Sequence, residues 1–200
     1  MKTREAFAVM APHFRDAVAV CALGVAANEW WAVTRSEETF YTHGSMGFAA
    51  SFALGLALSL PKTPVWMINA DGSLCMNLGC LLTEAGQQPR NLRHFVVDNR
   101  VYQTVGGTPM VNHRKTDYAA IARGAGLDNI WSLASVREVE QALPDILATD
   151  GPTFAVLNVE AEPNYGAKYA GSYEGPEMKY RFGRTLERKL GITVFGPQGY

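Results

Sequence analysis

Residues 64–73 read PVWMINADGS, and this stretch decides the fold class. Its first seven residues are apolar apart from one asparagine, which is typical of a strand buried on both faces of a sheet. Asp71, Gly72 and Ser73 then end the apolar run, and the pattern that follows over residues 74–85 is helical. A buried strand that leads through an acidic turn into a helix is one unit of a parallel α/β sheet.

The same alternation of strand and helix continues in both directions from this stretch. Further strands are predicted at residues 17–22, 93–98, 129–133 and 153–160, with a weaker one at 39–42. Further helices are predicted at residues 4–14, 28–34, 47–60, 117–125, 136–148 and 184–189. Apolar strands that are each followed by a helix predict an α/β fold, here a three-layer α/β/α domain with a mostly parallel six-stranded sheet.

Length and composition favour one main domain with a distinct end. The chain has 200 residues, of which 48% are hydrophobic and 18% charged, so it can bury one sizeable core. From residue 162 to 183 the composition turns to Gly, Pro, Tyr and Glu, which indicates an irregular segment. We therefore expect an α/β domain over residues 1–160 and a C-terminal arm over residues 161–200 that packs on this domain or on a partner.

The charge pattern excludes some classes of partner. The 18 Lys and Arg residues nearly balance the 19 Asp and Glu residues, and no basic stripe is present, so neither nucleic acid nor an anionic membrane is expected as a partner. The apolar residues 17–27 follow a long segment of mixed charge, unlike a signal peptide, and residues 46–60 fall short of the ~20 that a membrane span needs. The three cysteines form no CxxC pair, which disfavours disulfides and zinc or iron–sulfur sites and favours the cytoplasm.

Polar residues lie where two successive predicted strands end. Residues 71–73 (Asp-Gly-Ser) follow one strand, and residues 98–101 (Asp-Asn-Arg-Val) end the next. Asn99 comes 28 positions after Asp71, a spacing that holds one helix and one strand. Because adjacent parallel strands end at the same edge of a sheet, we expect these side chains at one edge, where α/β proteins bind ligands.

These groups suit a metal ion bound to a phosphate compound. The Asp71 carboxylate, the Asn99 amide oxygen and a nearby backbone carbonyl are oxygen donors of the kind that Mg²⁺ prefers. Gly72 lets the backbone come close, and Ser73 with the start of the following helix offers N–H groups to an anion. Each turn on its own also fits an ordinary turn or helix cap. The prediction therefore depends on the spacing between the two turns.

With the upstream residues 44–47 (Gly-Ser-Met-Gly), these turns resemble the diphosphate-binding domain of thiamine-diphosphate enzymes. That family has a Gly-Asp-Gly turn and an asparagine at the end of the next strand. The chain is similar in particular to sulfopyruvate and phosphonopyruvate decarboxylases, through residues 73–79 (SLCMNLG), 99–102 (NRVY), 106–109 (GGTP) and 176–182 (PEMKYRF). The resemblance covers nearly the whole chain, from about residue 18 to 182.

The resemblance implies thiamine diphosphate and Mg²⁺ as cofactors. Asp71 and Asn99 would bind Mg²⁺ through their side chains, and Val101 through its backbone carbonyl. Met46 would hold the cofactor bent, with ordinary core packing as its alternative. The implied cofactor contacts are Gly44, Ser45, Met46, Gly72, Ser73, Val101 and Tyr102, with the Gly44 carbonyl on the aminopyrimidine amine. His43 and Met46 are the expected catalytic residues, although His43 also fits a surface histidine, as does the weaker candidate His113.

The resemblance also implies a function: the β-type subunit of a thiamine-diphosphate- and Mg-dependent decarboxylase that acts on a small 2-oxo acid. Such enzymes need a second domain whose glutamate activates the pyrimidine, and 200 residues leave no room for it. A separate α-type subunit would therefore carry the pyrimidine-binding domain and the glutamate, in an α2β2 or larger hetero-oligomer. A carboligase or synthase subunit and a non-catalytic cofactor-binding scaffold remain alternatives.

Three residues depart from the family pattern. Ala70 replaces its first glycine, Arg100 stands where a small residue is common, and Thr108 replaces a glutamine. These changes bear on the substrate more than on the cofactor. Cationic contacts to an acidic substrate could come from Arg100, His43, Arg114 or Lys115, so the particular 2-oxo acid stays open.

Overall fold

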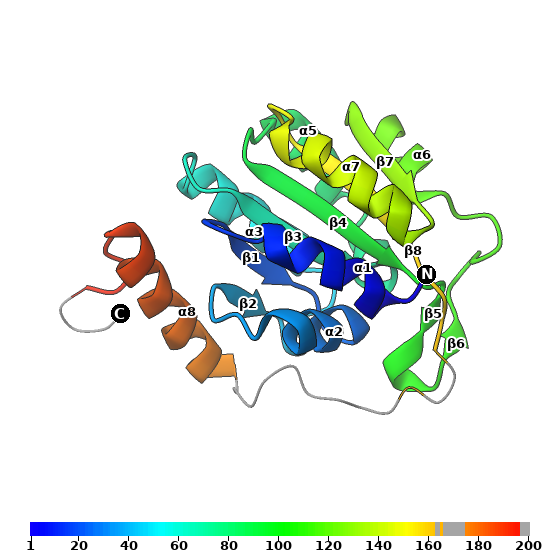
Figure 1. Ribbon diagram of the computed structural model, residues 1–200, viewed down its shortest axis with the longest axis horizontal. Coiled ribbons are helices and arrows are strands. Elements are labelled where there is room, and N and C mark those ends of the chain that lie inside the picture. Colours follow the sequence, from blue (N-terminus) through cyan, green and yellow to red (C-terminus); the bar gives the residue numbers. More distant parts are fainter. Residues whose placement is uncertain (163–164, 166–174, 197–200) are drawn as a thin grey trace.

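Six parallel strands form the central sheet in the computed structural model, which describes residues 1–162, 165 and 175–196 (Figure 1). The strand order is β2-β1-β3-β4-β8-β7, and every pairing between these neighbours is parallel. The strands are β1 (Val18–Cys21), β2 (Thr39–Tyr41), β3 (Val65–Ala70), β4 (Leu92–Asp98), β7 (Asn129–Leu133) and β8 (Thr153–Asn158). The predicted six-stranded parallel sheet is confirmed.

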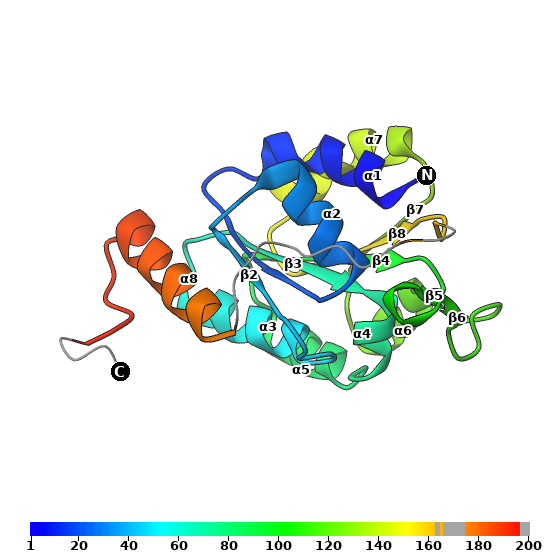
Figure 2. The same cartoon turned by 90° about the horizontal axis from the view of Figure 1, so that it is seen from below.

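Helices cover both faces of the sheet (Figure 2). On one face lie α1 (Thr3–Met10), α2 (Val25–Thr34) and α7 (Val136–Ala148). On the other face lie α3 (Ala49–Ser59), α4 (Asp71–Cys75), α5 (Cys80–Gln87) and α6 (Tyr118–Gly124). The fold therefore has the three layers that the sequence predicts.

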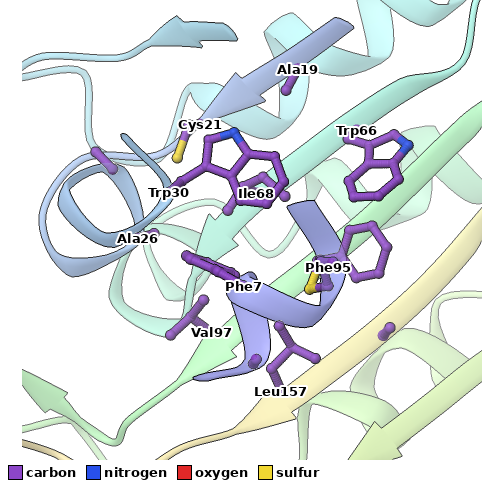
Figure 3. Packing of buried hydrophobic residues seen from close by; sticks show 14 of the residues in the cluster. Phe7, Ala19, Cys21, Ala26, Trp30, Trp66, Ile68, Phe95, Val97 and Leu157 are labelled. Carbon is purple, nitrogen blue, oxygen red and sulfur yellow. The ribbon is translucent and has the colours of Figure 1, made fainter. Parts of the chain in front are cut away.

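Aromatic side chains fill the core between the sheet and the first group of helices. Figure 3 shows Phe7, Trp30, Trp66 and Phe95 in this layer, and all four are almost fully buried. The Phe7 and Trp30 rings meet edge to face with centroids 5.3 Å apart, and the Trp66 and Phe95 centroids lie 5.2 Å apart. Burying several large rings removes apolar surface from water and stabilises a rigid sheet. The sheet can then hold the loops at its edge in fixed positions.

The topology creates a cleft at the carboxyl ends of β1 and β3. These two strands are neighbours, but the chain leaves β1 towards β2 and leaves β3 towards β4, on the opposite side. The loops that follow the two strands therefore diverge, and α/β proteins bind their ligands at such a switch point. The residues that sequence analysis singled out, Asp71 and Asn99, follow β3 and β4 at this edge.

Two predicted helices differ from the structure. The helix expected at residues 74–85 is two helices, α4 and α5, because the chain turns at residues 76–79, where Asn77 Nδ2 donates a hydrogen bond to the Gly47 carbonyl. The helix expected at residues 184–189 is α8, which spans Gly175–Leu190. The expectation of irregular structure up to residue 183 was therefore wrong, and the rest of that segment lies outside the described residues.

Helix α8 runs beside the edge strand β2 (Figure 1). Its buried side chains Met178, Phe182 and Leu186 recur at helical spacing, and the Phe182 ring lies 5.6 Å from that of Phe40 in β2. This apolar stripe explains why the segment is helical despite its many charged residues. No helix in the described part of the chain is both long and apolar enough to cross a bilayer.

Candidate active site

The loops at the switch point line a narrow cleft with a cavity volume of about 50 Å³. The loop after β1 contributes residues 23–26, the end of β3 contributes residues 70–73, and the chain after β4 contributes residues 101–104. Met46, Val97 and Asn99 complete the lining. The structure thus brings together Met46, Asp71, Gly72, Ser73, Asn99, Val101 and Tyr102, all of which sequence analysis predicted as site residues.

Asp71 is the buried acid of this cleft, with 3% of its surface exposed. One carboxylate oxygen accepts a hydrogen bond from the Gly72 backbone N–H at 2.7 Å. The other accepts one from the Arg100 backbone N–H, also at 2.7 Å. The carboxylate thus bridges the ends of β3 and β4 in a fixed orientation.

Asp98 is a second buried acid next to Asp71, and one of its carboxylate oxygens has no hydrogen-bond partner among the described residues. Burial, together with the charge of Asp98, raises the pKa of Asp71 to about 7 against the opposing effect of the Gly72 and Arg100 N–H groups. Burial also raises the pKa of Asp98. A cation bound nearby would lower both pKa values and keep the two groups ionised at neutral pH.

Arg100 supplies part of the positive charge. Its Nε lies 3.7 Å from an Asp98 carboxylate oxygen, and half of its side chain is exposed. The backbone of Arg100 has a φ of 63°, in the left-handed region that favours small residues. Arg100, which departs from the family pattern, therefore places a positive charge beside the two acids. Its backbone conformation is unfavourable for a residue that has a side chain.

Asn99 presents its amide beside these carboxylates. Its Oδ1 accepts a hydrogen bond from the Val101 N–H at 3.0 Å, and its Nδ2 donates to Gln103 Oε1 at 3.3 Å. Val101 and Tyr102 then form β5, which pairs with β6 (Thr108–Pro109) in a short antiparallel hairpin. The amide oxygen retains a second lone pair that can face a metal ion.

Gly72 lies directly under two side chains of the cleft. A Cβ built on Gly72 would come within 2.9 Å of Tyr102 Cε1 and 3.0 Å of Met46 Cε. Met46 and Tyr102 therefore both lie close to Gly72, which has no side chain. The glycine is needed here because the chain passes so close to the groups that line the cleft.

We expect the substitution Gly72→Ala to weaken ligand binding in this cleft about tenfold, because its methyl group would displace Tyr102 and Met46. The cost in stability should be smaller, since Met46 is unbranched and can move. Calorimetric titration gives the affinity and urea unfolding gives the stability. Gly86→Ala, on α5 with nothing within 4 Å of its Cβ, is the matched control. Equal binding by Gly72→Ala and the unchanged protein would contradict this role.

Contacts from the β3 end also fix the loop that carries Met46. Ser73 Oγ accepts a hydrogen bond from the Gly47 N–H at 3.1 Å, and Asn77 Nδ2 donates to the Gly47 carbonyl at 3.0 Å. Both backbone groups of Gly47 are thus held by residues of the next strand–helix unit. Its φ of 89° and the close approach of Met76 Cβ, 3.2 Å from a built Cβ, favour glycine at this position.

Three predicted residues lie outside the lining of the cleft. His43, Gly44 and Ser45 are exposed in the loop before Met46. The weaker candidate His113 is partly buried, and its Nδ1 lies 3.2 Å from the Met110 carbonyl oxygen. His43 is therefore not part of the cleft that the described residues form.

Sequence reasoning assigned no role to residues 23–26, Gln103 and Thr104, which also line the cleft. For residues 23–26 the sequence did hold a clue, because a glycine between a strand and a helix is typical of a binding loop. Gly24 lies in this position, between β1 and α2, and has a φ of 83°. For Gln103 and Thr104 the sequence carries no such signal.

Comparison with known proteins identifies the family. Residues 20–157 match the model of the thiamine pyrophosphate enzyme C-terminal TPP binding domain. The chain belongs to this family. The resemblance to thiamine-diphosphate enzymes, which sequence analysis stated, is therefore confirmed, and the match covers the strands from β1 to β8 that frame the cleft.

Two kinds of curated relative are similar to the chain. The sulfopyruvate decarboxylase subunit beta of Methanothermobacter thermautotrophicus is 40% identical over 145 residues, which is 72% of this chain and 75% of that subunit. Its counterpart in Methanocaldococcus jannaschii is 33% identical over 172 residues, covering 86% of this chain and 89% of the subunit. The phosphonopyruvate decarboxylase of Streptomyces viridochromogenes is 37% identical over 145 residues, but the chain covers only 36% of its length.

Solved structures confirm the fold. The benzoylformate decarboxylase of Polynucleobacter necessarius superposes with a TM-score of 0.68 at 19% identity, over 81% of this chain and 34% of that one. A thiamin diphosphate-dependent enzyme from Mycobacterium smegmatis gives a TM-score of 0.66 at 22% identity, over 80% of this chain and 32% of that one. The chain thus spans about a third of these larger proteins.

The residues present fit the cofactor of this family and a metal ion. Among the described residues, the half-exposed Arg100 offsets only part of the charge of the buried acids Asp71 and Asp98, and one Asp98 oxygen has no hydrogen-bond partner. Among the described residues no three His, Cys, Asp or Glu side chains cluster as metal ligands, so a metal here needs amide and backbone oxygens as well. Asn99 and Val101, which line the cleft, supply such oxygens. These donors are the type that Mg²⁺ prefers.

Proposed function

We propose that this chain is the β-type subunit of a thiamine-diphosphate- and Mg-dependent decarboxylase that acts on a small 2-oxo acid of the sulfopyruvate or phosphonopyruvate kind. The observation that carries the proposal is the buried pair Asp71 and Asp98 at the switch point, beside the cleft in which Gly72 lies close to Met46 and Tyr102. A pair of buried acids without a full counter-charge is unfavourable in a merely structural turn, so it favours a cation site. The named activities of the relatives support the reaction type.

In this proposal, the ends of β3 and β4 hold the metal. Asp71 and Asn99 would bind Mg²⁺ through their side chains and Val101 through its carbonyl oxygen. The metal would in turn neutralise the charge of Asp71, Asp98 and a bound diphosphate, with Arg100 offsetting part of the charge of Asp98. This arrangement supplies position and electrostatic balance.

The remaining contacts would position the organic cofactor, which supplies the carbanion chemistry for loss of CO₂ when it is bound. Gly72 and Ser73 would hold the diphosphate. Ser73 accepts a hydrogen bond from Gly47, so its hydroxyl hydrogen is available for a phosphate oxygen. Met46 and Tyr102 would form the apolar wall above Gly72. Gly44 and Ser45, in the exposed loop, would complete the contacts once a partner covers them.

A separate α-type subunit would complete the site. We propose that it carries the pyrimidine-binding domain and the activating glutamate, in an α2β2 or larger complex in the cytoplasm. The exposure of His43, Gly44 and Ser45 supports this, since predicted cofactor contacts lie open to solvent in the isolated chain. Residues 1–160 would form the cofactor-binding domain. Residues 161–200 would form the arm, of which α8 already packs on β2.

The test uses the complex that co-purifies with the tagged chain from its native host. Calorimetric titration with thiamine diphosphate, with and without Mg²⁺, measures cofactor binding, and release of CO₂ from sulfopyruvate, phosphonopyruvate and pyruvate measures activity. We expect Mg²⁺-dependent binding and an aldehyde product. Full activity of the chain alone would contradict the proposal that a partner subunit is needed. An acyloin product would favour the carboligase alternative, and cofactor binding without turnover of any of these acids would favour the cofactor-binding scaffold. Absence of cofactor binding by the complex would overturn the proposal.

A further inference from the structure

Gln103, in the turn after β5, makes contacts that reach from the candidate metal site to a distant part of the chain. Its side-chain amide pairs with the backbone of Glu162, 59 positions away. Gln103 Nε2 donates to the Glu162 carbonyl, and Gln103 Oε1 accepts from the Glu162 N–H at 3.3 Å. The side chain is partly buried and lines the cleft.

This pairing permits only one orientation of the Gln103 amide. A backbone carbonyl can only accept a hydrogen bond and a backbone N–H can only donate one. If the Gln103 amide were turned over, its NH₂ group would face the Glu162 N–H and its oxygen would face the Glu162 carbonyl. Both contacts would then be repulsive. The backbone of Glu162 therefore determines which side of Gln103 carries the oxygen.

The same oxygen of Gln103 determines the orientation of Asn99. Asn99 Nδ2 donates to Gln103 Oε1 at 3.3 Å, so the NH₂ group of Asn99 faces Gln103. Asn99 Oδ1 consequently lies on the opposite side, where the Val101 N–H donates to it at 3.0 Å. An amide turned the other way would present its NH₂ group, which cannot bind a cation.

We infer that Gln103 is a positioning residue for the metal site: it keeps the Asn99 oxygen directed towards the ion and connects this ligand to the chain that follows β8. The inference rests on the proposed function, because it assigns Asn99 to the metal. The Val101 N–H favours the same orientation of Asn99, so the contribution of Gln103 is partial. Groups that orient a metal ligand in this way contribute about 10- to 100-fold to metal affinity.

The experiment measures Mn²⁺ binding to the complex at saturating thiamine diphosphate, by electron paramagnetic resonance. Gln103→Met keeps the length of the side chain and removes both hydrogen-bonding groups. We expect its Mn²⁺ dissociation constant to rise about tenfold. Gln87→Met is the matched control, because Gln87 is exposed at the end of α5, away from the cleft. It should bind Mn²⁺ as the unchanged complex does.

A second background separates positioning from general damage to the fold. In Asn99→Asp, the carboxylate has two equivalent oxygens and no N–H to direct towards Gln103. Adding Gln103→Met to Asn99→Asp should then change the Mn²⁺ dissociation constant by less than about twofold. A tenfold loss in both backgrounds, or no loss in the native one, would overturn the inference. If the unchanged complex fails to bind Mn²⁺ with thiamine diphosphate, the proposed function itself fails, and the two failures are distinguishable.

Discussion

The substitution Asp71→Asn will lower the affinity of the complex for Mg²⁺ with thiamine diphosphate by about 100-fold or more. Loss of an outer group that only orients a ligand costs about 10- to 100-fold in metal affinity, so loss of the charged ligand itself should reach or exceed the upper end. Titration calorimetry with Mg²⁺ at fixed thiamine diphosphate provides the measurement. Asp128→Asn, an exposed carboxylate after α6, is the control and should bind normally. Unchanged affinity in Asp71→Asn would remove Asp71 from the metal site.

The same substitution should also change how the stability of the metal-free protein depends on pH. The pKa of Asp71 is about 7 in the folded chain against an ordinary value of 3.8, so the folded state holds a proton that the unfolded state releases. This group therefore stabilises the fold fully below pH 4, and its contribution is lost as the pH rises through 7. Without metal, the unchanged chain should lose stability over this range, and Asp71→Asn should lose less.

Thermal unfolding in EDTA at pH 5 and pH 8 tests this pH dependence. We expect the difference between the two proteins to move by roughly 1–2 kcal/mol in favour of Asp71→Asn at pH 8, since Asp98 shares the titration. In a chain of this size, 1 kcal/mol corresponds to about 2–4 °C in the midpoint. With excess Mg²⁺ and thiamine diphosphate the difference should shift in favour of the unchanged protein, because it binds the ion more tightly. A difference that does not vary with pH would contradict the buried acid pair.

The central strands β1, β3, β4 and β8 were predictable because their burial is nearly continuous. In β4 all seven residues are buried, so the apolar run predicts the strand even though it contains Arg93 and His94. What the sequence could not predict is how these two polar side chains are accommodated. Arg93 donates to the carbonyls of Thr149 and Gly151, more than 50 positions away, at the end of α7. Such partners become neighbours only through the order of strands in the sheet.

The helices were less predictable where local and distant contacts compete. The break between α4 and α5 depends on Asn77, whose side chain binds Gly47, 30 positions earlier. The full length of α8 depends on an apolar stripe packed on β2, although the average composition of this segment is polar. In both cases the local pattern is compatible with more than one structure, and packing selects among them.

The candidate site was predictable to the extent that it depends on two neighbouring strands. Asp71 and Asn99 end consecutive strands that pair in parallel, so their meeting follows from chain order. The loop of Gly24 was harder to place, because β1 lies beside β3 only through the crossover of the chain at β2. Gln103 could not be predicted at all, because its role depends on the backbone of Glu162.

A buried polar network behind the site leads to the second large prediction. Glu84 on α5 places an oxygen 2.8 Å from His94 Nδ1, and both side chains are almost fully buried. His94 Nε2 lies 3.0 Å from Asn69 Nδ2, and Asn69 Oδ1 accepts from the Ala70 N–H at 2.9 Å. Because the NH₂ of Asn69 can only donate, His94 Nε2 must accept, and His94 Nδ1 carries the hydrogen that binds Glu84.

The substitution Glu84→Leu should lower the free energy of unfolding by about 3 kcal/mol, because it leaves the His94 Nδ1–H buried without an acceptor. Moving that hydrogen to Nε2 would not help, since Nε2 would then face the NH₂ group of Asn69. Glu84→Gln should cost much less, because its amide oxygen can still accept from His94. Urea unfolding measures both variants, and equal losses in the two would show that size or charge matters more than this hydrogen bond.

Replacing both Glu84 and His94 tests whether the hydrogen bond between them stabilises the fold. His94→Leu alone leaves the Glu84 carboxyl without a donor, and one of its oxygens already lacks a partner among the described residues. The double variant Glu84→Leu, His94→Leu removes both polar groups together, so its loss should be smaller than the sum of the single losses. Simple addition of the two losses would mean that the side chains stabilise the core independently. A smaller loss would mean that the interior of the sheet depends on their pairing. The orientation of Asn69, which contacts His94 and lies two positions before Asp71, would then depend on the same pairing.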